Sequence, residues 1–407
     1  MSATKKRVLR TGRSIWQARA PRPVAARRLT ADVKAEVVVV GAGVSGAMVA
    51  EQLTEAGLDV VILDRRAPLS GSTPASTALL QYEIDESMTD LAAAIGLERA
   101  QRVWRRSKLA LDALRERTRR LGIACDMVDR DGLYLEGDAL DAAALEAEVE
   151  ARRDAGFETL FLDAAAVKRR FGIAGRAALL GYDNLSADPI RLAAGYLRTA
   201  LRRGARLYAP AEVAEVTPLA QSVRCETGNG RTIRARALVF ATGYETPKGV
   251  PAKGHGVVST FALATRPQPA RLWPEQCFIW EASDPYLYMR VGPEGSIICG
   301  GEDEAFADEA LRDAMLDEKT AAIEQKLAAL FPKIDPRARY RWCGSFGRSD
   351  TGTPSIGPAP GMANCYAVMG YGGNGITYSM MAAQMIRAMI LGRDDPDADL
   401  FSFTRRF

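Results

Sequence analysis

Histidine is nearly absent from this chain, because His255 is the only one among its 407 residues. A zinc or non-haem iron centre that needs several histidines cannot be assembled within such a chain. A Ser-His-Asp hydrolase would have to use His255 as its base, and no G-x-S-x-G turn accompanies it. We therefore expect no metal site, interpret His255 as a surface or loop residue, and expect any catalytic chemistry to use a cofactor.

Paired cysteines and long apolar runs are also missing. The six cysteines are scattered without a C-x-x-C pair, a pattern typical of free thiols in a reducing compartment. The longest nearly apolar stretch, residues 37–50, has 14 residues and three glycines, which is too short and too broken to cross a bilayer. The sequence therefore predicts a cytoplasmic protein without a transmembrane segment.

Positive charge is concentrated at the start of the chain. Residues 1–34 contain ten Lys and Arg against one acid, so this leader carries +9 and the remaining chain −5, for a net +4. The leader lacks the apolar core of a secretory signal, while a transit peptide or a nucleic-acid-binding arm is an alternative. The simplest interpretation is an extended segment that lies along the body, anchored by Trp16 and residues 21–23. We expect no nucleic-acid partner.

A strand, a glycine-rich turn, a helix and a second strand follow the leader. The run of four valines at 37–40 is typical of a buried parallel strand, and residues 58–63 form a second apolar run that ends at Asp64. Between them lie the G-x-G-x-x-G turn at 41–46 and a stretch compatible with a helix at 47–56. This order is that of the βαβ unit on which dinucleotide sites are built.

The residue types in this unit have separate physical roles. Gly41 permits the tight turn, Gly43 lets a pyrophosphate approach the backbone, and Gly46 allows close packing of helix on strand. The pyrophosphate would lie at the positive end of the helix, and Asp64 would accept hydrogen bonds from ribose hydroxyls. The spacing therefore predicts a dinucleotide site.

Three further segments indicate which dinucleotide. A Ser- and Thr-rich turn occupies residues 71–77, and a strand runs into Ala-Thr-Gly at 239–243. Near the end of the chain, Trp-Cys-Gly at 342–344 and a turn at 352–357 precede the glycine-rich turn at 370–377, from which a helical pattern runs to Leu391. Together with the βαβ unit, these segments resemble the D-amino-acid oxidase family of FAD-dependent amine oxidoreductases, in the branch of glycine oxidase and monomeric sarcosine oxidase.

This resemblance implies an α/β fold in which a Rossmann-type FAD-binding domain is interleaved with a substrate domain built on a mixed or antiparallel sheet with helices. By this resemblance, residues 35–88, 155–245 and 342–395 would form the FAD-binding domain. Residues 89–154 and 246–341 would form the substrate domain. The last glycine turn would bring a helix N-terminus to the flavin ring, where backbone N–H groups stabilise its anionic reduced form.

The FAD-binding residues that the resemblance and the motifs imply fall in the same segments. They are Gly41, Gly43, Val44, Ser45, Gly46, Asp64, Arg65, Arg66, Ser72, Thr73, Ser76, Thr77, Val213, Ala241, Thr242, Gly243, Gly344, Gly372, Gly373, Asn374, Gly375, Ile376 and Thr377. The other G-x-G-x-x-G match, at residues 370–375, falls in the segment that the resemblance assigns to the flavin, so none is left for a second nucleotide, which argues against a reductase that also holds NAD(P)H.

Candidates for the substrate side come from two places. Along residues 286–291 the pattern has a period of two, so Tyr286, Tyr288 and Arg290 share one face, which either holds a substrate carboxylate or is a half-exposed strand with aromatic neighbours. The flavin-proximal segment adds Arg348 and Tyr371. We expect Tyr288, Arg290, Arg348 and Tyr371 to position the substrate, with Gln81 and Tyr82 as weaker candidates.

Two positions depart from the family. Sarcosine-oxidase-type members carry a lysine on the strand above the flavin that promotes reaction with oxygen, and Ile298 stands near that position here. A dehydrogenase with another acceptor is therefore as compatible with the sequence as an oxidase. Cys343 lies close to where some members attach FAD through a thioether, but we expect an inert core thiol and non-covalent FAD.

The resemblance implies an enzyme that oxidises the CH–NH bond of an amino acid or other carboxylated amine. The imine product would be hydrolysed, and the electrons would pass to oxygen or another acceptor. Two alternatives stay open: an FAD-dependent 2-hydroxy-acid dehydrogenase, and a flavin-binding protein without turnover.

Overall fold

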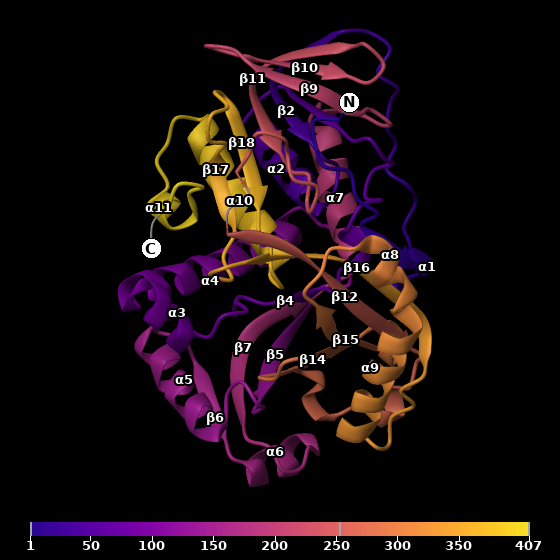
Figure 1. Ribbon diagram of the computed structural model, residues 1–407, viewed down its shortest axis with the longest axis vertical. Helices are drawn as coiled ribbons and strands as arrows, with labels where there is room; N and C mark the ends of the chain where they lie inside the picture. The colour runs from indigo at the N-terminus through magenta and orange to yellow at the C-terminus, as the bar shows by residue number, and fades with distance from the viewer. Residues whose placement is uncertain (1, 252–253, 406–407) are drawn as a thin grey trace.

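Two β-sheets organise the chain, and the computed structural model describes residues 2–251 and 254–405. In Figure 1 the first sheet occupies the upper part and the second the lower part. The first sheet has the order β17 (Ser355–Pro358), β18 (Cys365–Met369), β11 (Thr232–Phe240), β2 (Val33–Val40), β3 (Val60–Leu63) and β8 (Arg206–Tyr208). In addition, β10 (Val223–Thr227) pairs with β11, and β9 (Val213–Pro218) pairs with β10.

The valine run forms the centre of this first sheet. β2 pairs in parallel with β3 on one side and β11 on the other. Val37 and Val39 pack into one apolar cluster, while Val38 and Val40 pack into another on the opposite face. Because both faces of the strand are covered, the run is continuously apolar rather than alternating.

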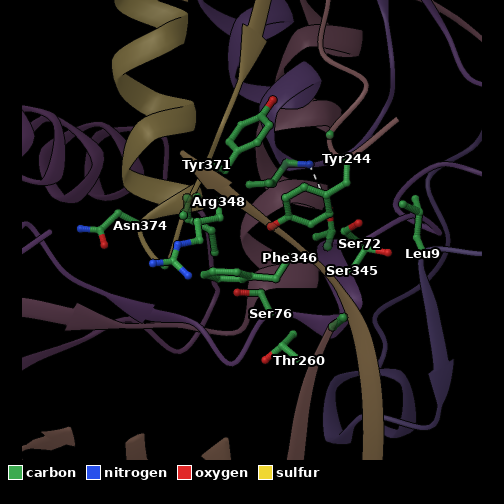
Figure 2. A pocket seen from close by; sticks show the side chains of 18 of the residues that line it. Leu9, Ser72, Ser76, Tyr244, Thr260, Ser345, Phe346, Arg348, Tyr371 and Asn374 are labelled. Atoms are coloured by element: carbon green, nitrogen blue, oxygen red, sulfur yellow. Dashed lines mark hydrogen bonds between the residues drawn. The ribbon is translucent and has the colours of Figure 1, made fainter. Parts of the chain in front are cut away.

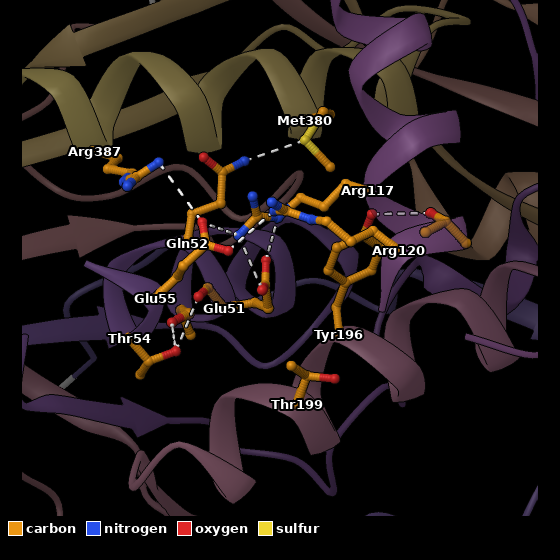
Figure 3. Close-up of polar contacts among 12 residues, drawn as sticks. Glu51, Gln52, Thr54, Glu55, Arg117, Arg120, Tyr196, Thr199, Met380 and Arg387 are labelled. Atoms are coloured by element: carbon orange, nitrogen blue, oxygen red, sulfur yellow. Dashed lines mark hydrogen bonds and ion pairs between the residues drawn. The ribbon is translucent and has the colours of Figure 1, made fainter. Parts of the chain in front are cut away.

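Two helices, α2 (Val44–Glu55) and α10 (Gly375–Ile390), pack on one face of the first sheet. On them pack α7 (Pro189–Arg202), against α2, and α4 (Leu97–Arg120), against α10. Buried Glu51 of α2 accepts hydrogen bonds from Arg117 of α4 at 2.6 Å and from Arg203 after α7 (Figure 3). A buried carboxylate requires such partners, so this ion pair fixes α2 against its neighbouring helices.

The second sheet is mostly antiparallel, with β13 and β5 as a parallel pair. Its order is β1 (Arg10–Gly12), β16 (Ala338–Ser349), β12 (His255–Thr265), β15 (Ile297–Glu304), β14 (Leu287–Val291), β13 (Phe278–Glu281), β5 (Val128–Leu135), β7 (Ala178–Ser186) and β4 (Leu79–Leu80), with β6 (Thr159–Leu162) beside β7. The remaining helices are α1 (Ile15–Ala18), α3 (Met88–Ile95), α5 (Ala142–Asp154), α6 (Ala164–Phe171), α8 (Glu309–Ala314), α9 (Leu316–Leu330) and α11 (Ala398–Phe401).

This architecture confirms the predicted fold class of a Rossmann-type sheet interleaved with a mixed sheet. The predicted domain bounds need correction at three places. Residues 79–80, 159–186 and 342–349, which we placed in the FAD-binding domain, contribute β4, β6 with β7, and the end of β16 to the second sheet, because each pairs with a strand of that sheet.

The basic leader lies along the body, as expected of an extended segment. Its strand β1 pairs with β16, and Trp16 is 1% exposed. Residues 21–23 are half-buried or exposed, and they are held to the body by a hydrogen bond from the Arg198 guanidinium to the carbonyl of Arg22. Val24 and Leu29 are buried beside them, because their apolar side chains reach the cores beside the first sheet.

Candidate active site

A cavity of about 620 Å³ is lined by residues of both sheets (Figure 2). Most of the predicted FAD-binding residues line it, from the turn after β2 to the turn before α10. Those that line it are Gly41, Gly43, Val44, Ser45, Asp64, Arg65, Arg66, Ser72, Thr73, Ser76, Thr77, Val213, Ala241, Thr242, Gly243, Gly372, Gly373, Asn374, Gly375 and Ile376. Segments far apart in the sequence thus converge on one space.

Three predicted cofactor residues lie behind this wall. A Cβ at Gly46 would stand 1.8 Å from the carbonyl oxygen of Gly41, so this glycine serves the packing of α2 on β2. Gly344 pairs with Arg10 of the leader. Thr377 donates a hydrogen bond to the carbonyl of Gln81 at 2.8 Å. These residues shape the wall without lining the cavity.

The turn after β2 presents a helix end to the cavity. Gly41 has φ +113°, and a Cβ there would stand 2.2 Å from the carbonyl oxygen of Ala241. Gly43 caps α2 without a side-chain hydrogen bond, and the N–H of Val44 donates to the Thr73 hydroxyl at 3.0 Å. The positive end of a 12-residue helix therefore faces the space where a pyrophosphate would bind.

Asp64 is held by backbone donors at the end of β3. Its carboxylate accepts hydrogen bonds from the N–H groups of Ala42 at 2.7 Å and Arg66 at 2.8 Å. Burial raises the pKa of Asp64, while these two N–H groups lower it. The carboxylate keeps lone pairs that are available to ribose hydroxyls.

The two arginines predicted to bind the cofactor follow Asp64 in the cavity lining. Arg65 and Arg66 both form salt bridges with Glu245, the second at 2.7 Å, so much of their charge is compensated within the protein. The hydroxyl of Ser72 and the Nη1 of Arg65 are buried without a hydrogen-bond partner among the described residues. Such orphaned donors fit the phosphate oxygens of a dinucleotide.

A second helix end lies at the opposite part of the cavity, where α10 begins after Asn374. The side chain of Asn374 donates to the carbonyls of Gln81 at 2.9 Å and Glu83 at 2.8 Å. Gln81, one of the weaker substrate-side candidates, also lines the cavity. Tyr82 does not, because its ring stacks on Phe157 in the apolar core at 5.4 Å.

Three acids near this helix end were missed by the sequence analysis. Asp85, Glu86 and Asp303 all line the cavity. Asp85 is solvent-exposed at the cavity, and its carboxylate accepts a hydrogen bond from the N–H of Gly373 at 2.8 Å. No motif marks these acids, because Asp303 approaches the other two only through the pairing of β15 within the second sheet.

These acids influence one another electrostatically. Desolvation by the surrounding protein and the charges of Glu86 and Asp303 raise the pKa of Asp85, the Gly373 N–H and Arg348 lower it, and the net result is a pKa of about 6. Burial also raises the pKa of Asp303, which accepts a hydrogen bond from the Tyr286 hydroxyl at 2.8 Å. The wall thus carries more acid than base.

The predicted substrate face of β14 is only partly at the cavity. Tyr286 and Tyr288 line it, with ring centroids 5.8 Å apart. Arg290 does not, which corrects the prediction that it positions the substrate. Its guanidinium lies 5.0 Å from the centre of the Trp16 ring and donates to the carbonyl of Ala187, because the leader covers this end of the strand face.

The two other candidates are at the cavity. Arg348, near the end of β16, points toward Asn374 in Figure 2, and its guanidinium makes no hydrogen bond or salt bridge to another described residue. Tyr371 lies edge-to-face with Tyr244, at 6.1 Å between ring centroids. Arg348 is therefore a cation available to a ligand.

The remaining predicted positions lie away from the cavity wall. Cys343 is buried with its Sγ 3.5 Å from a carboxylate oxygen of Asp313, and burial raises its thiol pKa to about 11. Ile298 is buried in the core, and no lysine is among the described lining residues.

His255 starts β12, half-buried and hydrogen-bonded to Ser355 at 2.8 Å, rather than lying in a loop. Pairing of β12 with β16 draws it into the sheet.

Two searches of the described residues gave negative results. Within residues 2–251 and 254–405, no group of three or more His, Cys, Asp and Glu side chains is arranged to hold a metal ion. No helix in this part of the chain is both long and apolar enough to cross a membrane.

Comparison with known proteins defines the class. The model of the DAO family, described as FAD dependent oxidoreductase, matches residues 36–389, so this chain belongs to that family. This confirms the family and the FAD-dependent oxidoreductase class that the sequence predicted.

Individual relatives are distant. The chain is 26% identical over 383 residues to gamma-glutamylputrescine oxidoreductase of Escherichia coli K12, covering 92% of this chain and 86% of that protein. It is 20% identical to the probable oxidoreductase OrdL of Haemophilus influenzae, with 90% and 85% covered. Among solved structures, glycine oxidase from Geobacillus kaustophilus has a TM-score of 0.77 at 20% identity, with 92% and 100% covered. L-proline dehydrogenase from P. horikoshii has a TM-score of 0.74 at 17% identity, with 91% and 97% covered. These two structures share its fold.

Proposed function

We propose that this protein uses FAD to oxidise the CH–NH bond of an amino acid or other carboxylated amine. The observation that carries the proposal is one cavity that joins the dinucleotide turn at Gly41 to an unpaired cation, Arg348, and a cluster of acids. The imine product is released to hydrolysis, and the electrons pass to oxygen or another acceptor.

The chain's own residues provide two helix ends and one acid for the cofactor. The start of α2 and the Ser72 hydroxyl would hold the pyrophosphate, Asp64 would hold a ribose, and the start of α10 would supply N–H groups to the flavin. Bound FAD supplies the electron sink for the hydride equivalent removed from the substrate carbon. The protein then has to place that carbon and manage the protons around it.

Arg348 is the residue we assign to the substrate carboxylate. A guanidinium binds a carboxylate through two parallel hydrogen bonds, and this one has no partner among the described residues. Tyr286, Tyr288 and Phe346 line the same space and exclude water from the reacting carbon.

The acids favour an amine over a hydroxy acid. Asp85, Glu86 and Asp303 line the same cavity as Arg348, so the local charge attracts an ammonium group and gives no advantage to a neutral hydroxyl. With its pKa raised to about 6, Asp85 is better matched than an ordinary carboxylate to take a proton from the ammonium before oxidation. A neutral amine is the form that gives up a hydride.

We further propose that FAD is bound non-covalently and that the enzyme is a slow oxidase or a dehydrogenase. Cys343 lies in the core on the far side of the cavity wall, with a thiol pKa raised to about 11. No lysine of the described residues lines the cavity to assist oxygen. All six cysteines are free and buried, which supports a cytoplasmic protein.

The test is a panel of amines, amino acids and 2-hydroxy acids added to the yellow protein without oxygen. Bleaching of the flavin by carboxylated amines alone supports the proposal, and bleaching by hydroxy acids alone replaces it with the dehydrogenase alternative. If no compound bleaches the flavin, the protein binds flavin without turnover. Comparing the rates at which air and a quinone dye reoxidise the reduced flavin then separates an oxidase from a dehydrogenase. Release of free flavin on acid precipitation establishes non-covalent binding.

A further inference from the structure

The leader contributes to the wall of the cavity. Ser2, Thr4 and Leu9 are lining residues, although the leader lies outside the part of the chain that matches the family, which begins at residue 36. We use the name strap for residues 2–16. It reaches the cavity beside the Ala241–Gly243 turn and leaves it beside the Ser- and Thr-rich turn at 71–77.

One end of the strap is fixed by backbone hydrogen bonds. The N–H of Ala3 donates to Val213 at 2.9 Å, and its carbonyl accepts from the N–H of Lys248 at 2.9 Å. The N–H of Lys5 donates to Thr246 at 3.0 Å. Val213, at the start of β9, also lines the cavity, so the strap and the first sheet form adjacent parts of the cavity wall.

The middle of the strap is fixed to the charged cluster. The N–H of Arg7 donates to the carboxylate of Glu245 at 3.0 Å, and its carbonyl accepts from the guanidinium of Arg66 at 3.0 Å. Both partners line the cavity and are salt-bridged to each other. The strap therefore completes the hydrogen bonding of residues that the cofactor site uses.

The other end of the strap holds the Ser- and Thr-rich turn. Leu9 is 7% exposed, and its carbonyl accepts from the N–H of Ser345 at 2.9 Å. Arg10 donates to the carbonyl of Gly71 at 3.2 Å, and the indole N–H of Trp16 donates to the carbonyl of Ser76 at 2.7 Å. Two strap side chains thus fix both ends of a turn whose hydroxyls face the cavity.

We propose that the strap is part of the cofactor site: it walls the FAD cavity, positions the turn at 71–77, and must open before FAD can leave. This inference rests on FAD binding by the family, and it does not depend on which substrate is oxidised. Thermodynamic linkage allows two tests, one of FAD affinity and one of strap stability. A strap that stabilises bound FAD must itself be stabilised by FAD to the same extent.

The first experiment measures FAD dissociation from the full chain, from a variant lacking residues 2–9, and from Trp16→Phe. We expect the deletion to raise the Kd for FAD by about tenfold or more. We expect Trp16→Phe, which loses the indole hydrogen bond but keeps a smaller aromatic ring, to raise the Kd by about threefold to tenfold. Arg19→Ala is the matched control, because Arg19 also belongs to the leader but pairs with Glu294 away from the cavity, and its Kd should be unchanged.

The second experiment uses the unaltered chain and does not depend on whether a variant folds. Trypsin cleavage at Lys5, Lys6 and Arg7 is followed with and without saturating FAD. We expect FAD to slow cleavage by about the same factor by which the deletion raises the Kd for FAD. Equal cleavage rates, or an unchanged Kd in the deletion, would overturn the proposal.

The same outcomes separate this inference from its rivals. Binding of the full chain, but not the deletion, to DNA or anionic vesicles with no change in FAD affinity would identify the leader as a nucleic-acid arm or targeting segment. A full chain that retains FAD but oxidises no carboxylated amine would contradict the proposed function and leave the proposal about the strap unaffected.

Discussion

The carboxylate of Asp64 accepts a hydrogen bond from the backbone N–H of Ala42 at 2.7 Å, which ties the end of β3 to the glycine turn at the end of β2. The acid predicted to bind ribose therefore also fixes the turn predicted to bind pyrophosphate. Loss of its charge should affect both halves of the site.

Replacing Asp64 with Asn should lower FAD affinity by about 10- to 100-fold, since hydrogen bonds to a charged group contribute about 1.5–3 kcal/mol. Titration of the FAD-free protein followed by flavin fluorescence measures this. Asp59→Asn is the control, because Asp59 precedes the same strand but pairs with Arg206 at the surface. An equal effect of the two substitutions would refute a role for Asp64 in the site.

A methyl group at Gly46 should destabilise the protein strongly. Its Cβ would stand 1.8 Å from the Gly41 carbonyl oxygen, so α2 would have to move away from β2, at a cost of about 1–3 kcal/mol or more. Urea unfolding of Gly46→Ala tests this beside Gly228→Ala, where nothing lies within 4 Å of the added Cβ. Similar midpoints for the two variants would contradict close packing at this turn.

Arg348→Gln should reduce kcat/KM for carboxylated amines by about 10- to 100-fold, through loss of a charge-assisted pair of hydrogen bonds. The same amine without its carboxylate should lose little, because it never used the guanidinium. Anaerobic flavin reduction in a stopped-flow instrument measures both substrates. An equal loss of kcat/KM for both substrates would show that Arg348 maintains the structure of the site and does not bind the carboxylate. Arg290→Gln serves as a comparison outside the cavity and should show no such substrate dependence.

The pH profile should report Asp85. Its pKa is raised from 3.8 to about 6, so the carboxylate gains a proton as pH falls through 6 and no longer attracts an ammonium. We expect kcat/KM to fall on the acid side with a step near pH 6, and Asp85→Asn to lower kcat/KM and remove the step. His255→Asn should keep it, because His255 does not line the cavity and its pKa is lowered to about 4 by burial.

The same shift has a consequence for stability. Because the folded state holds this proton more tightly than the unfolded state, the stabilisation from protonated Asp85 is present in full below pH 3.8 and is lost as pH rises through 6. Asp85→Asn should therefore raise the Tm of FAD-free protein at pH 7 and leave it almost unchanged at pH 3.5. A gain of the same size at both pH values would exclude burial of this charge as the cause.

The amino-acid sequence determined the parts of the site that are built from consecutive residues. The valine run, the three glycines and Asp64 specify strand, turn, helix and acid by their spacing, and all of them lie where that spacing requires. Such elements are predictable because the periodicity of a strand and the sterics of a turn act over a few residues. The segments at 71–77 and 370–377 were found through family resemblance, and they too converge on the cavity.

Only the tertiary structure decided which residues of a strand face are used. Tyr288 and Arg290 share one face of β14, yet Trp16 of the leader covers Arg290 and leaves Tyr288 at the cavity. The cluster of Asp85 and Asp303 and the position of the leader arise in the same way, from pairing between segments hundreds of residues apart. A local sequence pattern cannot identify such partners, because the burial of a side chain and the charge around it depend on which distant segment packs against it.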